Sequence, residues 1–128
     1  MFKAKDGGST KAIGDDAETL ALPYLQRQGL VLVQRNYRVA GGPHARGAEV
    51  DLILRERDGT LVFVEVRSRA GIKHGGAAAS VGGSKQRRIV RAAQHYLLRQ
   101  KALPPCRFDV VALDGGHIQW LKAAFDAG

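Results

Sequence analysis

The chain has 128 residues, with 20 lysine and arginine against 12 aspartate and glutamate side chains, a net charge of +8 and a pI near 10.2. Hydrophobic residues make up 45% of it, enough for a folded core, but no apolar run approaches the roughly 20 residues of a membrane span or the stretch of about 7–15 residues of a signal peptide. The single cysteine, Cys106, excludes an internal disulfide framework and a multi-cysteine zinc site, and its place at a strand start predicts a buried small side chain. We therefore expect a cytoplasmic protein that does not associate with membranes.

The first segment of the chain is predicted to be a flexible arm over residues 1–12, followed by a single domain over residues 13–128. A helix is predicted over residues 13–28, where apolar side chains recur at helical spacing: Ala17, Leu20, Ala21, Tyr24 and Leu25. Asp15 or Asp16 can cap its start, and Gly29 marks its end. Pro23 predicts a bend within this helix, because a proline has no amide proton to donate.

The middle of the chain alternates apolar and polar residues, which is typical of strands, over residues 30–38, 48–55 and 61–67. Asp58-Gly59 is the turn signal between the last two of these strands. A Gly/Ala-rich loop at 70–83 leads to a helix that Ser84 is expected to cap and that should end near Lys101. Two more strands follow, at 107–113 and 118–121, so the predicted order is α-β-β-β-α-β-β.

The second helix lies in a strongly basic stretch. Between Val66 and Phe108 there are ten lysines and arginines and no acid. At 100° per residue, one face of the helix is apolar and the opposite face carries Arg87, Arg88, Arg91, His95 and Arg99. Such a stripe is either a solvated helix face or a surface that contacts nucleic-acid phosphates. Lys85, at its edge, is open to the same two interpretations.

Two carboxylates are predicted to face each other in the hairpin. With the hairpin centred on Asp58, Leu54 lies opposite Val62, and Asp51 lies opposite Glu65. Like charges at such a distance are destabilising, so the pair needs a reason. A divalent cation bound by both carboxylates is one reason; a register shifted by two residues, or two side chains that turn into water, are the others.

The same register predicts the two faces of the hairpin. One face should be apolar and turned to the core: Val50, Leu52, Leu54, Val62, Val64 and Val66. The other should carry Glu49, Asp51, Ile53, Phe63, Glu65 and Arg67. Arg67 then lies opposite Glu49, where it forms either a cross-strand ion pair or a cation aimed at a phosphate.

Several ordered motifs resemble the YraN family of small bacterial proteins. They are Glu49-Val-Asp51-Leu-Ile, Phe63-Val-Glu65-Val-Arg67-Ser-Arg69, Lys85-Gln86-Arg87 and Cys106-Arg107-Phe108-Asp109-Val110-Val111, with Gly14-Asp15 and Glu18 before them. The resemblance runs from Gly14 to Asp126 and covers nearly the whole chain.

The resemblance implies an α/β fold of the restriction-endonuclease-like, PD-(D/E)XK superfamily, similar to archaeal Holliday-junction resolvases. Its core is a mixed central sheet flanked by helices, in the order α-β-β-β-α-β. Carried over residue by residue, the catalytic set is Glu18, Asp51, Glu65 and Arg67. Asp51 and Glu65 would bind Mg²⁺ or Mn²⁺, and the residues expected to contact nucleic acid are Arg69, Lys85, Arg87, Arg88 and Arg91.

Arg67 departs from that pattern, which has a lysine at this place. Arginine effectively keeps its proton, so Arg67 cannot act as a general base but can hold a phosphate. Our leading hypothesis is a metal-dependent endonuclease that hydrolyses phosphodiester bonds in DNA, including branched or structured DNA. The alternatives are a nucleic-acid-binding module of the same fold that has lost cleavage, and an interaction protein whose basic face docks an acidic partner. The partners that the sequence leaves open are DNA or another nucleic acid and a second copy of the chain in a homodimer.

Overall fold

A computed structural model describes residues 10–68, 81–114 and 116–127, with side chains from Ala17 onward. Its elements are α1 (Thr10–Arg27), β1 (Val31–Val39), β2 (Ala48–Arg55), β3 (Leu61–Ser68), α3 (Gly83–Leu97), β4 (Cys106–Asp114) and β5 (His117–Phe125). The predicted order α-β-β-β-α-β-β is confirmed. No helix in the described ranges has the length and apolar composition needed to cross a bilayer.

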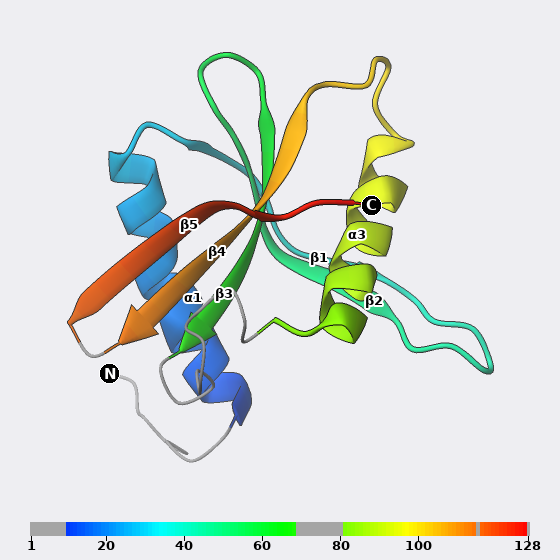
Figure 1. Ribbon diagram of the computed structural model, residues 1–128, viewed down its shortest axis with the longest axis horizontal. Helices are drawn as coiled ribbons and strands as arrows, with labels where there is room; N and C mark the ends of the chain where they lie inside the picture. Colours follow the sequence, from blue (N-terminus) through cyan, green and yellow to red (C-terminus); the bar gives the residue numbers. More distant parts are fainter. Residues whose placement is uncertain (1–9, 69–80, 115, 128) are drawn as a thin grey trace.

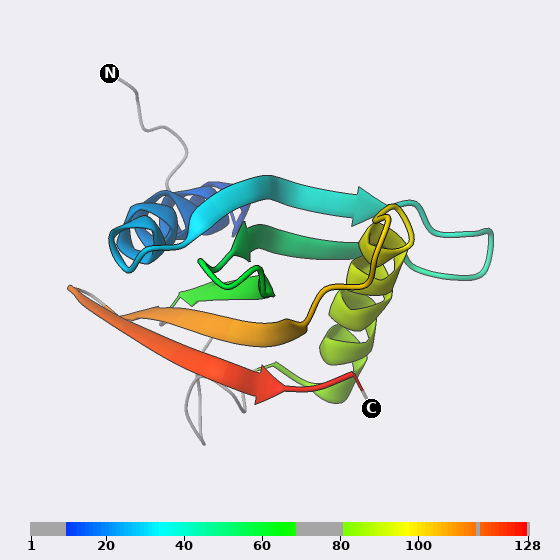
Figure 2. The same ribbon diagram turned by 90° about the horizontal axis from the view of Figure 1, so that it is seen from above.

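The five strands form one mixed sheet in the order β1-β2-β3-β4-β5. Only β3 and β4 pair in parallel, and α3 lies on the connection between them; the other neighbours are antiparallel. The strands are strongly twisted, and α1 and α3 lie on opposite sides of them (Figures 1 and 2). The predicted fold class, a mixed sheet flanked by helices, is therefore confirmed.

Two apolar clusters fill the space between the sheet and its helices. Under α1, Ala21 and Leu25 pack against strand residues that include Leu52, Leu54 and Val64. Under α3, the packed residues include Ile53 and Phe63 of the sheet with Ile89, Ala92, Ala93 and Tyr96 of the helix. From Leu52 onward in β2, and along β3, alternate residues thus face opposite helices, as the period of a strand requires.

The helices differ in detail from the prediction. α1 begins at Thr10, three residues earlier than expected, and continues through Pro23. Its buried stripe is Ala17, Ala21 and Leu25, one residue every fourth position, whereas Leu20 is 57% exposed because it lies off this narrow stripe. Leu20, although it shares the helical spacing of the apolar residues, therefore does not face the core.

The start and end of α3 also differ from the prediction. Gly82 is the N-cap residue, and no side chain caps the helix, so the assignment of this role to Ser84 is wrong. The helix ends at Leu97, and beyond the C-cap residue Leu98 the amides bond three residues back, Arg99 N–H to the Tyr96 carbonyl and Gln100 N–H to the Leu97 carbonyl. Cys106 is exposed at the first residue of β4, so the prediction that it is buried is also wrong.

The hairpin register is the predicted one as far as the two strands pair. Leu54 lies opposite Val62 and Leu52 opposite Val64, and the pairing ends there. Beyond this point β3 continues beside β4 to Ser68. The strands β2 and β3 therefore separate at Asp51.

Val50 lies on the opposite side of the sheet from the one predicted. It packs in the cluster under α3, while Leu52 packs under α1, so the two do not share a face. At the same level of the sheet, on β1, Asn36 has φ 50 and sits between the pairs Arg35–Leu52 and Tyr37–Val50, opposite Asp51. A left-handed residue breaks the regular alternation of a strand, and the sheet is irregular where the carboxylates are.

Candidate functional site

Asp51 and Glu65 lie together at the point where β2 and β3 separate. The Asp51 Oδ2 atom accepts a hydrogen bond of 2.8 Å from the Val66 amide, so the side chain satisfies a strand N–H at the end of the ladder. The two carboxylates are close enough that the charge of Asp51 raises the pKa of Glu65, which is only 3% exposed. The structure thus brings together the two acids that the register placed opposite each other.

Burial makes both carboxylates difficult to ionise. It raises the pKa of Glu65 to about 8, and the negative charge of Asp51 adds to that increase. Burial also raises the pKa of Asp51, although the hydrogen bond from Val66 opposes the change. In the absence of a cation, the pair therefore retains a proton at neutral pH.

Two cations flank the pair. The Lys85 Nζ atom, from α3, and the Arg67 Nη1 atom, from β3, each lie 3.6 Å from Glu65 Oε2. Both charges lower the pKa of Glu65, but burial outweighs them. Glu49 forms an ion pair with Arg38 at 3.4 Å, while Arg67 lies beside Glu65.

The donor set suits a hard divalent cation. Glu65 Oε1 is buried and has no hydrogen-bond partner among the described residues. When both carboxylates are ionised, they offer only acceptor oxygens. A divalent cation can then take the place of the proton that the pair holds at neutral pH. The fit is limited to two carboxylates, because the described residues contain no group of three or more His, Cys, Asp or Glu side chains that could bind a metal.

Glu18 is not part of that pair. It lies on α1, is 7% exposed, and its Oε1 atom lies 3.8 Å from Arg35 Nη2 on β1. α1 covers the opposite face of the sheet from α3, which carries Lys85. Among the described residues, the carboxylate site is therefore built by β2, β3 and α3.

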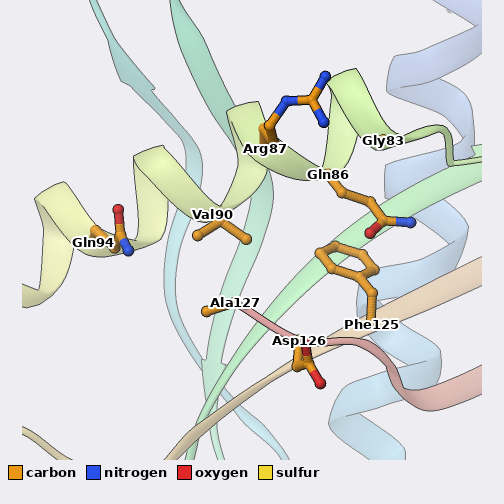
Figure 3. Close-up of a pocket in the computed structure, with 8 residues that line it drawn as sticks. All are labelled: Gly83, Gln86, Arg87, Val90, Gln94, Phe125, Asp126 and Ala127. Carbon is orange, nitrogen blue, oxygen red and sulfur yellow. The ribbon is translucent and has the colours of Figure 1, made fainter.

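The basic residues of α3 face two different pockets. Arg87 lines a pocket of about 630 Å³ between α3 and the C-terminal segment, with Phe125 and Asp126 (Figure 3). Arg88 lines a second pocket, of about 550 Å³, on the side of the loop between β1 and β2. Arg91 Nη2 donates to the Arg46 carbonyl at 2.6 Å and so ties this loop to α3. Arg69 lies outside the described residues.

Comparisons with known proteins place this chain in a family. The model of the uncharacterised protein family UPF0102 matches residues 17–113, which include Glu18, Asp51, Glu65 and Lys85. The chain belongs to the UPF0102 family. This confirms the resemblance to the YraN family, which is the same family.

Relatives in the UPF0102 family match over most of their length. The UPF0102 protein of Methylibium petroleiphilum is 70% identical over 119 residues, which cover 93% of this chain and 98% of that protein. The UPF0102 protein of an Acidovorax species is 60% identical over 119 residues, 93% of this chain and 88% of that protein. That of Cupriavidus metallidurans is 58% identical over 125 residues, 98% of this chain and 89% of that protein.

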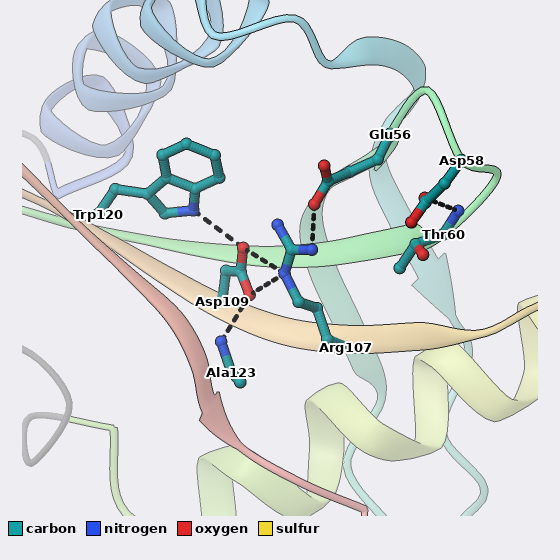
Figure 4. A network of polar contacts seen from close by, with 7 residues as sticks. All are labelled: Glu56, Asp58, Thr60, Arg107, Asp109, Trp120 and Ala123. Atoms are coloured by element: carbon teal, nitrogen blue, oxygen red, sulfur yellow. Dashed lines mark hydrogen bonds and ion pairs between the residues drawn. The ribbon is translucent and has the colours of Figure 1, made fainter.

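This UPF0102 protein also buries Asp109 on β4, in a network that joins several strands (Figure 4). Its carboxylate accepts hydrogen bonds of 3.0 and 3.1 Å from Arg107 Nε, 2.9 Å from Trp120 Nε1 and 2.9 Å from the Ala123 amide. Arg107 also pairs with Glu56 at the turn after β2. The only signal of this network in the sequence is an aspartate inside the apolar run of β4.

Two functional candidates are visible only in the folded chain. Arg38 on β1 and Arg46 in the following loop share the pocket of Arg88, although 42 residues separate Arg46 from Arg88 in sequence. Lys85, which the sequence places among the expected nucleic-acid contacts, also lies beside Glu65. No local spacing relates these residues, because tertiary packing brings them together.

Proposed function

We propose that this protein is a cytoplasmic, metal-dependent endonuclease that hydrolyses phosphodiester bonds in DNA, including branched or structured DNA. The observation that carries the proposal is the part-buried Asp51 and the buried Glu65, with Lys85 and Arg67 beside Glu65. Acids buried next to each other are costly in a sheet that could bury apolar side chains instead, which points to a function. The resemblance to the restriction-endonuclease-like superfamily supports the same interpretation.

Asp51 and Glu65 are the residues that would hold Mg²⁺ or Mn²⁺. When bound, such a cation supplies Lewis-acid stabilisation of the phosphate and lowers the pKa of a bound water. The fixed hydrogen bond from Val66 orients the Asp51 carboxylate before any ligand arrives. Release of the shared proton would leave both carboxylates charged.

Lys85 and Arg67 would balance the negative charge of the phosphate. Both lie next to Glu65 and are part-buried, with side chains 33% and 27% exposed, so they reach the site and the solvent together. Arg67 offers a planar fork that suits phosphate and stays charged. Lys85 supplies, from α3, a lysine next to the carboxylates where β3 has none.

A second candidate function is a nucleic-acid-binding module without cleavage. The observation that favours it is Arg67 itself, because β3 carries no lysine that could exchange a proton. Binding in this case would depend on the same basic residues but not on Asp51 or Glu65.

The deciding experiment is a cleavage assay on linear, nicked and four-way DNA and on RNA, with Mg²⁺, Mn²⁺ or EDTA. We expect cation-dependent cleavage that Asp51→Asn lowers by on the order of a hundredfold or more, while the exposed acid variant Asp58→Asn has no effect. Arg67→Lys should retain or raise the rate, whereas Arg67→Ala should lower it by about a hundredfold.

Thermal unfolding gives an independent readout of the cation site. Mn²⁺ should raise the melting temperature of the wild type but not of Glu65→Gln, because the cation binds only the folded protein. Absence of cleavage of every nucleic acid, by the wild type and by Arg67→Lys, would contradict the endonuclease; binding that persists in that case would leave the binding module.

A further inference from the structure

Three arginines from different parts of the chain converge on one pocket. Arg38 comes from β1, Arg46 from the loop between β1 and β2, and Arg88 from α3, and all three line the pocket of about 550 Å³. Figures 1 and 2 show this loop extending beyond α3. Glu49 is the acid in the lining, and it is paired with Arg38. The lining therefore carries a net positive charge of two.

The pocket is held in shape by backbone contacts. The hydrogen bond from Arg91 to the Arg46 carbonyl fixes the loop to α3. A Cβ atom on Gly41 would lie 2.2 Å from the Ala45 carbonyl oxygen, and one on Gly47 would lie 2.9 Å from the Val39 carbonyl oxygen. The loop closes so tightly that both positions require glycine, and the arginines project from a constrained frame.

Arg88 has unused hydrogen-bonding capacity. Its Nε–H is buried and has no hydrogen-bond partner among the described residues, although its side chain is only part-buried. A buried guanidinium donor without a partner is costly, and a bound anion would relieve that cost. A guanidinium also matches the oxygens of a phosphate in shape and charge.

The pocket adjoins the proposed catalytic site. Glu49, which lines it, precedes Asp51 by two residues, about 7 Å along a strand. At about 3.4 Å of axis per nucleotide in each strand of a duplex, this separation corresponds to one or two nucleotides.

We propose that Arg38, Arg46 and Arg88 form a binding site for a backbone phosphate one or two nucleotides away from the phosphodiester at Asp51 and Glu65. This inference rests on the proposed function for its ligand, the phosphodiester backbone of a nucleic acid. The site positions the strand and touches no base, so it gives affinity without sequence preference.

The test is the salt dependence of binding to a short DNA duplex and to an RNA duplex of the same sequence, in EDTA, followed by fluorescence anisotropy. Arg88→Gln and Arg46→Gln should each raise the Kd about tenfold and reduce the slope of log K against log salt by about 0.9 on the duplex. The matched control is Arg55→Gln, an exposed arginine at the other end of β2. It removes the same charge outside the pocket and should change neither quantity appreciably.

The two proposals fail in different ways. If Arg88→Gln and Arg46→Gln bind as tightly as the control Arg55→Gln and the wild type, the phosphate site is overturned, even if the protein cleaves DNA. If both pocket variants bind more weakly than the control and the wild type never cleaves, the phosphate site is supported and the endonuclease is overturned. Arg46 is exposed, so Arg46→Gln keeps the test valid if Arg88→Gln does not fold. An effect on only one of the two duplexes supports the site and names the nucleic acid that it binds.

Discussion

Asp109 and Glu65 are both buried acids, on the neighbouring strands β4 and β3, but they have opposite surroundings. Asp109 accepts hydrogen bonds from Arg107, Trp120 and the Ala123 amide, all at 3.1 Å or less. Glu65 faces another acid, its cations lie 3.6 Å away, and one of its oxygens has no hydrogen-bond partner among the described residues. The first arrangement stabilises the fold, whereas the second stores a cost that a ligand can relieve.

The largest effect on stability should follow from breaking the satisfied network. Asp109→Ala leaves Arg107 and Trp120 without their buried acceptor and should lower the free energy of unfolding by about 3–5 kcal/mol. Asp51→Ala removes one of two competing acids and should change it by less than about 1 kcal/mol, or increase it. Urea unfolding measures both. Equal losses would show that the two acids do not differ in the way described.

The next effect concerns pH. The pKa of Glu65 is raised from 4.5 to about 8 in the folded state, so the unfolded chain loses this proton first as pH rises. The contribution of Glu65 to stability is therefore fully present below about pH 4.5 and is lost as pH rises to about 8. In EDTA, unfolding measured from pH 5 to 9 should show this decline in the wild type. Glu65→Gln should flatten it, and Asp58→Asn should not.

The smallest effect tests the cation from α3. The charge of Lys85 lowers the pKa of Glu65, so Lys85→Met should move the midpoint of the pH-dependent decline to higher pH. Lys101→Met, which removes a lysine that is exposed beyond the end of α3, serves as the control. A midpoint that does not move would show that solvent screens the Lys85–Glu65 contact completely.

The element order and the carboxylate pair could be predicted because they depend on local patterns. The turn at Asp58-Gly59 sets the register, and the register places Asp51 opposite Glu65 without any knowledge of the rest of the fold. The side of Val50 could not be predicted, because strict alternation along β2 breaks between Val50 and Leu52, next to the left-handed Asn36 of β1. The pocket of Arg38, Arg46 and Arg88 and the acceptor role of Asp109 also depend on distant packing, for which period and spacing carry no signal.

The hydrogen bond from Val66 to Asp51 has a consequence for spectroscopy. An amide that donates to a carboxylate changes its chemical environment when the carboxylate gains a proton or a cation, so the Val66 resonance should follow the occupancy of the site. The neighbouring amides of β3, which bond within the parallel ladder to β4, provide an internal reference. The resonance of this one backbone amide thus gives a titration curve for the carboxylate pair without any substrate.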